Sequence, residues 1–322
     1  MSETWNAPQR EVTPEAAVMS RRKWLARLGL GGIALAGAGG GLLYAFRRPD
    51  PERVLGHRQE HAPGANLYPA RLNTGFKDGG RPLTDEQEAA TYCNFYEFSG
   101  GKAVYRHIDR FRTAPWQVEV KGLVARPHTY DIDDLVKSFP LEERVYRHRC
   151  VEAWAMVVPW TGFPLAALLR AAEPLPGAKF VRLVSFRKPE EAGRQRDPGM
   201  PWPYTEGLTL AEATNELAFL ATGMYGHPLL KQHGAPVRLV VPWKYGFKGA
   251  KSVVTIEVTD RQPATFWNTL VPHEYDFWAN VDPAIPHPRW SQARERMLGT
   301  GETYDTVKYN GYGEWVAKLY KA

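Results

Sequence analysis

Short runs of alternating apolar and polar positions recur along the chain and predict a set of strands. The alternation is clearest at residues 115–124, 179–186, 237–241 and 252–258, and residues 144–151 also read as a strand. Helical spacing is limited to residues 131–139, which open with acidic side chains, and to residues 164–172, where Pro164 stands near the first turn. Because these pieces follow no regular strand–helix–strand rhythm, the pattern predicts one mixed, mainly β domain of the α+β class.

Composition agrees with this fold class and narrows the function. The 322 residues include 29 Gly, 26 Pro and 11 Trp, which favours short strands joined by turns over a helix bundle. The formal charge is +6, but much of the basic excess sits at the N-terminus, so the chain gives little reason to expect nucleic acid as a partner. Two cysteines are too few for a four-cysteine iron–sulfur cluster, and no glycine-rich nucleotide loop follows a strand.

The N-terminus has the pattern of an export signal. Arg21 and Arg22 precede a charge-free, glycine-rich stretch from Leu28 to Phe46, as in a twin-arginine signal. An uncleaved membrane anchor is the alternative, since no clean cleavage site follows that stretch. The twin-arginine route carries folded proteins, so the signal indicates a periplasmic protein whose cofactor is inserted before export.

Three parts follow from these patterns. Residues 1–48 are the predicted export signal. Residues 49–90 are rich in Pro, Gly and charge without a sustained period, and we expect an extended arm there. Residues 91–322 contain the strand and helix patterns and are predicted to be the domain that carries the function.

Cys150 is the residue with the clearest chemical potential, and it allows two readings. On a strand, His148 and Cys150 share one face while Arg147 and Arg149 take the other. A cationic neighbour lowers the pKa of a thiol, and a thiolate is a soft metal ligand. The other reading is a disulfide to Cys93, which spacing alone favours in an exported chain.

The segment around Cys150 resembles a known family. Residues Arg149–Trp154 with Val157–Leu165 are similar to the molybdenum-ligating segment of the sulfite-oxidase-type molybdopterin superfamily, in its periplasmic protein-methionine-sulfoxide reductase branch. Four further stretches fit the same branch in the same order: Asn94–Phe98, Pro140–Arg144, Val241–Lys248 and His287–Gln292. They span most of residues 91–315, so the resemblance covers the domain and implies that residues 91–322 bind molybdopterin and are catalytic.

The resemblance implies a Mo-molybdopterin cofactor with Cys150 as the protein sulfur on the metal, which requires a free thiolate. It places the cofactor against ten residues: Cys93, Asn94, Tyr96, Glu97, Ser185, His233, Arg238, Gly249, Ala250 and Lys251. Cys93 and His233 stand where the family pattern has Asn. Arg238 and Lys251 suit the cofactor phosphate, although Arg238 can also pair with a carboxylate inside a sheet.

Glu152 is a second catalytic candidate, because on the strand face of Cys150 it is able to deliver protons; an ion pair to Arg147 or Arg149 is the structural alternative. The resemblance further implies reduction of methionine sulfoxide in oxidised periplasmic proteins, with electrons from a membrane haem b subunit linked to quinol. Two alternatives stay open. One is a sulfite-oxidase-like enzyme acting on a small anion or an S- or N-oxide, and the other is a non-catalytic exported binding protein with a Cys93–Cys150 disulfide.

Overall fold

The computed structural model describes residues 54–56, 62 and 64–320. The predicted export signal, residues 1–48, lies outside the described residues, as does the start of the predicted arm. The described residues from 54 to 196 and from 201 to 320 belong to one compact unit. The other unit is described only at Asp197–Met200, a turn in which Gly199 N donates to Asp197 Oδ1 at 2.9 Å. Among the described helices, none has the length and apolarity needed to cross a bilayer.

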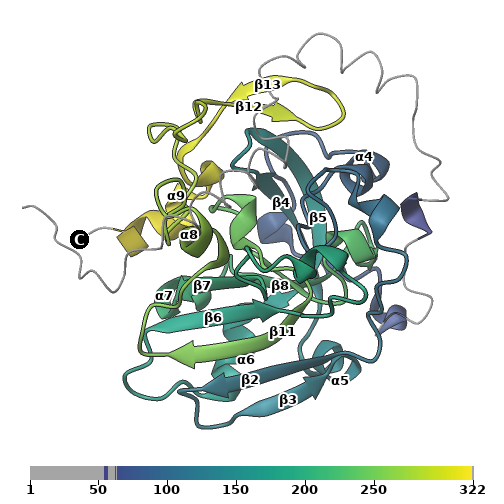
Figure 1. Ribbon diagram of the computed structural model, residues 1–322, viewed down its shortest axis with the longest axis vertical. Helices are drawn as coiled ribbons and strands as arrows, with labels where there is room; N and C mark the ends of the chain where they lie inside the picture. Colours follow the sequence, from purple (N-terminus) through teal and green to yellow (C-terminus); the bar gives the residue numbers. More distant parts are fainter. Residues whose placement is uncertain (1–53, 57–61, 63, 321–322) are drawn as a thin grey trace, which may run out of the picture. The chain divides into compact units, whose positions relative to one another are not determined.

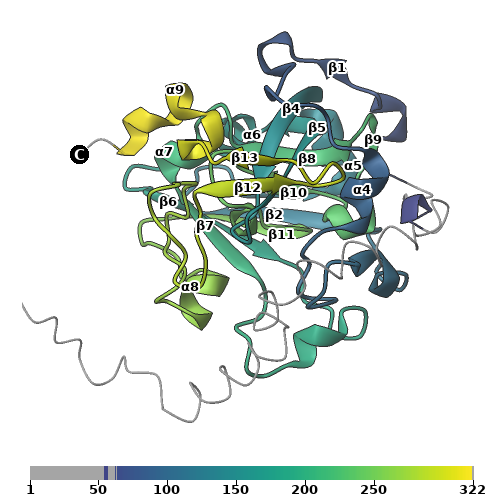
Figure 2. The same cartoon turned by 90° about the horizontal axis from the view of Figure 1, so that it is seen from above.

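One sheet is built around a long hairpin. Within the described residues it runs β1 (Arg71–Leu72), β4 (Glu142–Arg149), β5 (Trp154–Pro164), β12 (Arg294–Met297) and β13 (Thr303–Asp305), with β8 (Phe219–Met224) also on β5 and with β9 (His227–Pro228) and β10 (Arg238–Val240) on β8. β4 and β5 pair antiparallel from Glu142 opposite Gly162 to Arg149 opposite Ala155. The C-terminal segment returns to this sheet, where β12 pairs with β5 in parallel (Figure 2).

The second sheet contains most of the predicted strands (Figure 1). Its order is β3 (His128–Asp131), β2 (Gln117–Gly122), β11 (Val253–Thr259), β6 (Phe180–Ser185) and β7 (Thr205–Thr209). Only β2 and β11 run parallel, and the other pairs are antiparallel. The four segments predicted as strands from their alternation are observed as β2, β6, β10 and β11. The predicted α+β, mainly β fold class is confirmed as well.

The helices of the described residues are short. They are α4 (Glu86–Thr91), α5 (Ile132–Ser138), α6 (Leu165–Ala172), α7 (Leu210–Ala213), α8 (Phe266–Leu270) and α9 (Gly313–Val316), and α5, α6 and α7 directly follow the strands β3, β5 and β7. Single 3-10 turns occur at η2 (Ala65–Leu67), η3 (Thr74–Phe76), η4 (Val104–His107), η5 (Gly193–Arg196), η6 (Lys231–His233), η7 (Gly246–Lys248), η8 (Lys308–Gly311) and η9 (Ala317–Tyr320). The two predicted helices appear as α5 and α6, each beginning one residue later than predicted, after Asp131 and Pro164.

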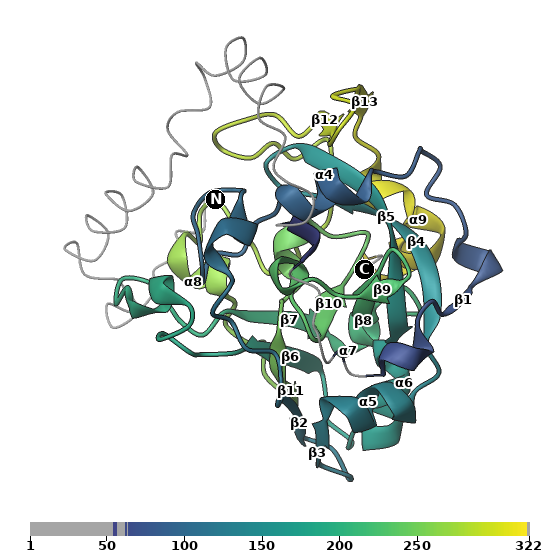
Figure 3. The same cartoon turned by 90° about the vertical axis from the view of Figure 1, so that its right-hand side faces the viewer.

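The alternation pattern misses the central strand β5. All but one of its residues are buried, so both faces are apolar and no period of two is visible. The residues before α4 are held against this strand, because Thr84 N donates to Val157 O at 2.8 Å and Val157 N donates to Thr84 Oγ1 at 3.1 Å (Figure 3). Trp160 on β5 and Trp243 are fully buried and belong to the core.

Candidate functional site

Cys150 begins a tight turn between β4 and β5. Cys150 N donates to Trp154 O at 2.9 Å, and Ala153 N donates to Cys150 O at 3.0 Å, which closes a three-residue hairpin loop. Ala153 has a φ of 64°, the left-handed conformation that this loop requires at its last position. The predicted strand at residues 144–151 is confirmed as β4 up to Arg149, but its continuation to residue 151, with Glu152 on the strand face of Cys150, is wrong. The sequence did not predict this turn, because glycine or asparagine usually marks a left-handed position and here the residue is alanine.

The Cys150 thiol is buried, and a side-chain amide contacts it. Asn94 Nδ2 donates to Cys150 Sγ at 3.6 Å. Burial, followed by the charge of Glu152, raises the pKa of the thiol to about 12, so the lowered pKa expected from the neighbouring arginines is wrong. Those guanidinium groups bond elsewhere, Arg147 to Gly79 O and Arg149 to Glu295. A metal ion displaces the proton of a ligating thiol directly, so the group still suits a metal.

The disulfide reading fails in this structure. Cys93 and Cys150, both within the described residues, are free thiols. Cys93 Sγ instead donates to Gln232 O at 3.4 Å.

Glu152 pairs with a lysine and not with the predicted arginines. Lys102 Nζ contacts Glu152 Oε2 and also donates to Asn94 Oδ1, so one ammonium group joins the carboxylate to the amide that contacts Cys150. Tyr96 OH and Trp154 Nε1 donate to the two carboxylate oxygens of Glu152, each at 3.4 Å. The sequence reasoning missed Lys102; its only signal was its place in the loop that follows the Asn94–Phe98 motif.

Two cations, Arg238 and Lys251, donate to backbone carbonyls and form no salt bridge with a carboxylate of the described residues. Arg238 is buried and donates to the carbonyls of His233 at 3.0 Å and Leu239 at 3.3 Å. Lys251 Nζ donates to the carbonyls of Asn94 and Gln232, both at 2.8 Å. Neither cation has an ion pair with a carboxylate of the described residues, so the predicted structural alternative for Arg238 is wrong. Burial lowers the pKa of Arg238 to about 10 and that of Lys251 to about 8. Buried positive charge of this kind calls for an anionic ligand.

Neutral histidines border these cations. His233 Nε2 bonds Ala89 O at 3.2 Å and therefore carries the proton, which leaves Nδ1 as a buried acceptor with no partner in the described structure. Burial, and then the charge of Lys251, lowers the pKa of His233 to about 3. Burial together with Arg238 and Lys251 does the same for His148.

Two glycines let the backbone approach these side chains closely. A Cβ on Gly246 would lie 2.5 Å from the His148 ring, and one on Gly249 would lie 2.8 Å from Arg238 Nη2. Ala250, the next residue, is fully buried. Only a residue without a side chain fits at either position without displacing its neighbour.

Glu97 and Ser185 complete the cluster. Ser185, at the end of β6, has its Oγ 2.7 Å from Lys251 O and 3.3 Å from Glu97 Oε1, so its single hydroxyl proton faces both acceptors. Burial raises the pKa of Glu97 to about 7. The structure thus joins the candidates from distant parts of the sequence through direct contacts, with Asn94 bridging Cys150 on one side and Lys251 on the other.

Comparison with known proteins gives this cluster a family. Residues 105–267 match the family described as oxidoreductase molybdopterin binding domain. The chain is also 46% identical over 322 residues to the protein-methionine-sulfoxide reductase catalytic subunit MsrP of Burkholderia mallei, covering 98% of this chain and 93% of that protein. The chain belongs to the family of these catalytic subunits. Among solved structures, the sulfane dehydrogenase SoxCD of Paracoccus pantotrophus aligns with 15% identity and a TM-score of 0.43 over 81% of this chain and 66% of that one.

Family membership makes the chain an oxidoreductase with a Mo-molybdopterin cofactor, and the residues present fit that group. Arg238 and Lys251 offer positive charge to its phosphate, and the free Nδ1 of His233 is able to accept a hydrogen bond from a pterin N–H group. Among the described residues, no three His, Cys, Asp or Glu side chains are grouped to hold a metal. Molybdopterin brings two sulfurs of its own, and the free thiol of Cys150 is able to add a protein sulfur to them.

Proposed function

We propose that the chain reduces methionine sulfoxide residues in oxidised periplasmic proteins, with Cys150 as the protein ligand of molybdenum. Asn94 supports this proposal most directly, because its side chain contacts the Cys150 sulfur while its carbonyl binds Lys251 in the cation pocket. A thiol and an anion site linked by one residue suit a cofactor that carries both a metal and a phosphate. The relative named above acts on protein methionine sulfoxide, which supplies the substrate class.

The reaction converts a sulfoxide, two electrons and two protons into a thioether and water. When bound, the cofactor would supply the two-electron reduction chemistry. The chain's own residues bind, orient and handle protons. Burial, followed by the charge of Glu152, raises the pKa of Tyr96 well above its usual value, so its hydroxyl stays protonated and is able to donate toward Glu152 Oε1. Glu152 lies in the turn that Cys150 begins, and Lys102 holds its carboxylate there. It is the proposed group through which protons reach the sulfoxide oxygen, received from the donors that contact it, such as the Tyr96 hydroxyl.

Aromatic side chains pack beside the turn. Trp290 Nε1 donates to Val151 O at 2.8 Å, and the Trp267 ring contacts Tyr96 and Tyr275 at centroid distances of 5.0 and 5.1 Å. Trp290 is partly exposed, and we propose that its ring offers an apolar surface to the methyl and methylene groups of a methionine side chain. We further propose that the electrons come from a membrane haem b subunit linked to quinol, and that residues 1–48 direct export by the twin-arginine route.

A pair of cysteine variants tests the ligand. Cys150→Ser is expected to lose molybdenum while its circular dichroism and thermal unfolding stay close to wild type. Cys93→Ser is the matched comparison, because Cys93 is also a buried free thiol, but the cofactor contact that the resemblance implies there is not a bond to the metal. This variant is expected to keep molybdenum. Metal analysis of both purified variants decides. Full molybdenum content and activity in Cys150→Ser would defeat the proposal.

Substrate assays on the wild-type enzyme test the reaction. We expect reduction of methionine sulfoxide in an oxidised protein with a chemical electron donor, and little sulfite oxidation with an electron acceptor. A larger kcat/KM for sulfite would support the sulfite-oxidase-like alternative instead. Arg149, the arginine nearest in sequence to Cys150, is fully occupied by protein partners and offers no binding group to a small anion.

A further inference from the structure

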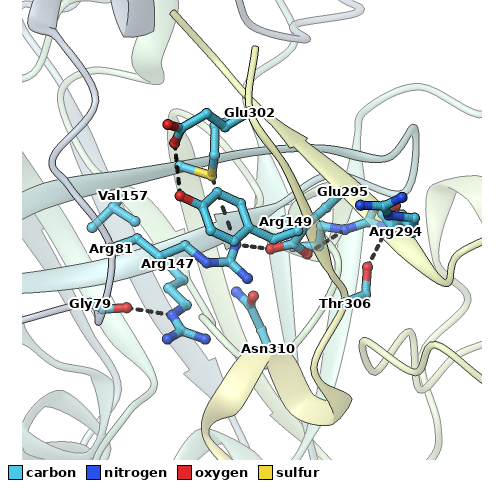
Figure 4. Close-up of polar contacts among 12 residues, drawn as sticks. Gly79, Arg81, Arg147, Arg149, Val157, Arg294, Glu295, Glu302, Thr306 and Asn310 are labelled. Atoms are coloured by element: carbon cyan, nitrogen blue, oxygen red, sulfur yellow. Dashed lines mark hydrogen bonds and ion pairs between the residues drawn. The ribbon is translucent and has the colours of Figure 1, made fainter. Parts of the chain in front are cut away.

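The guanidinium of Arg149 is fully buried one residue before Cys150, at the centre of a dense set of hydrogen bonds (Figure 4). Nη1 donates to the carbonyl of Cys150 itself. The other donors reach the C-terminal segment: Nε to Glu295 Oε2 at 2.9 Å, and Nη2 to Gln292 Oε1 at 2.9 Å, Thr306 Oγ1 at 3.2 Å and Arg294 O at 3.2 Å. Arg149 therefore connects the backbone of the Cys150 turn to residues more than a hundred positions away.

The same C-terminal segment holds two more carbonyls of the turn. Val151 O accepts from Gln292 Nε2 at 2.7 Å as well as from Trp290. Ala153 O accepts from Arg296 N at 2.9 Å, next to the pairing of β12 with β5. Residues 290–306 thus fix the carbonyls of Cys150, Val151 and Ala153, either directly or through Arg149.

Glu295 provides the charge that makes this arrangement stable. Its side chain is 1% exposed, and its two oxygens accept from Arg149 and from Arg81. Without that carboxylate, the buried Arg149 guanidinium would be uncompensated, which is strongly unfavourable. The turn also contains a non-glycine residue in a left-handed conformation, and such strain persists only where the surroundings determine the backbone.

We propose that Arg149, Gln292 and Glu295 are positioning residues that set the place of the Cys150 sulfur. The inference rests on the proposed role of Cys150 as the molybdenum ligand. Outer residues that hold a ligand commonly change metal affinity or activity when they are mutated. Here they act through the ligand's carbonyl and the adjoining peptide, and none of the three contacts the sulfur.

Variants of two equally buried, ion-paired glutamates distinguish a positioning role from a general effect on stability. Glu295→Gln removes the charge facing Arg149. Glu212→Gln is the matched control, because Glu212 is also 1% exposed and pairs with the buried Lys244 at 2.5 Å, where it caps α7 far along the chain from the turn. Both variants are purified as holoenzyme, and molybdenum content, thermal unfolding, the Mo(V) electron paramagnetic resonance signal, kcat and KM are measured.

We expect both variants to unfold at lower temperature and to keep molybdenum. Glu295→Gln alone should broaden or shift the Mo(V) signal and lower kcat roughly tenfold with little change in KM. Identical spectra and kcat in the two variants would overturn the inference. If Glu295→Gln does not fold, Gln292→Met removes the bonds to Val151 and Arg149 with similar volume and is judged by the same readouts. Molybdenum retained in Cys150→Ser would instead refute the ligand proposal, whatever Glu295→Gln does.

Discussion

Asn94 donates its side-chain amide to the sulfur of Cys150 at 3.6 Å. The contact joins two segments that are 56 positions apart in sequence, the loop after α4 and the turn between β4 and β5. The orientation of the amide is fixed from its other end, because Lys102 Nζ donates to Asn94 Oδ1 and leaves the nitrogen to face the sulfur. A hydrogen bond to a ligating thiolate withdraws negative charge from it, and such bonds tune the reduction potential of a metal centre.

Asn94→Leu keeps the volume of this side chain and removes the hydrogen bond. Hydrogen bonds to charged groups contribute about 1.5–3 kcal/mol, so we expect kcat/KM for methionine sulfoxide to fall at least about tenfold. The molybdenum potential should move to a more negative value, as measured by redox titration of the Mo(V) signal. An unchanged potential and rate would mean that the amide does not act on the sulfur.

Lys102→Met tests the ammonium group that links Asn94 to Glu152. Removing it leaves the Glu152 carboxylate, 8% exposed, without its cation and frees the Asn94 amide to rotate. We expect kcat to fall about tenfold or more at nearly constant KM, because the lysine orients groups at the reacting centre. Lys188→Met is the control, since Lys188 has a similar exposure of 31% and pairs with Glu191 away from the site. Equal kinetics in the two variants would remove Lys102 from the site.

Glu97 is expected to make the folding stability of the cofactor-free protein depend on pH. Burial raises the pKa of Glu97 to about 7 in the folded state, above its ordinary value of 4.5. The folded state therefore binds the proton more tightly, and the stability contributed by this group is complete below pH 4.5 and is lost as pH rises through about 7. The buried His148 and His233 have the opposite effect, because burial lowers their pKa values and their contribution is lost as pH falls below 6.5.

The comparison that isolates Glu97 is wild type against Glu97→Gln. The free energy of unfolding of wild type minus that of the variant should decrease by on the order of 3 kcal/mol between pH 4.5 and 7.5. Urea unfolding of the cofactor-free proteins at intervals of half a pH unit measures this difference. A constant difference across that range would show that Glu97 titrates normally in the folded protein.

The sequence predicted the fold class and the cofactor family better than it predicted the geometry of the turn. Half-buried strands such as β2 and β11 show a period of two, but β5 is buried on both faces and shows none. The turn after Cys150 has alanine at its left-handed position, so the local sequence contains no glycine or asparagine that would predict it. Lys102 and the Arg149–Glu295 pair depend on contacts between distant segments, and single-sequence patterns do not contain such contacts.

Arg238→Met separates a ligand-binding cation from a structural one. In the cofactor-free protein, Arg238 is a buried charge without a carboxylate partner among the described residues, so an apolar replacement should leave the melting temperature unchanged or raise it. Arg144→Met is the matched control, because Arg144 is equally buried but pairs with Glu142, and its loss should lower the melting temperature. When cofactor is supplied, Arg238→Met should be the more impaired variant in cofactor loading, because only this variant loses a partner of the cofactor phosphate. It should be purified with little molybdenum. Differential scanning calorimetry and metal analysis of both variants provide the comparison. A large destabilisation of cofactor-free Arg238→Met, with normal cofactor loading, would show that the buried charge serves the fold and not the ligand.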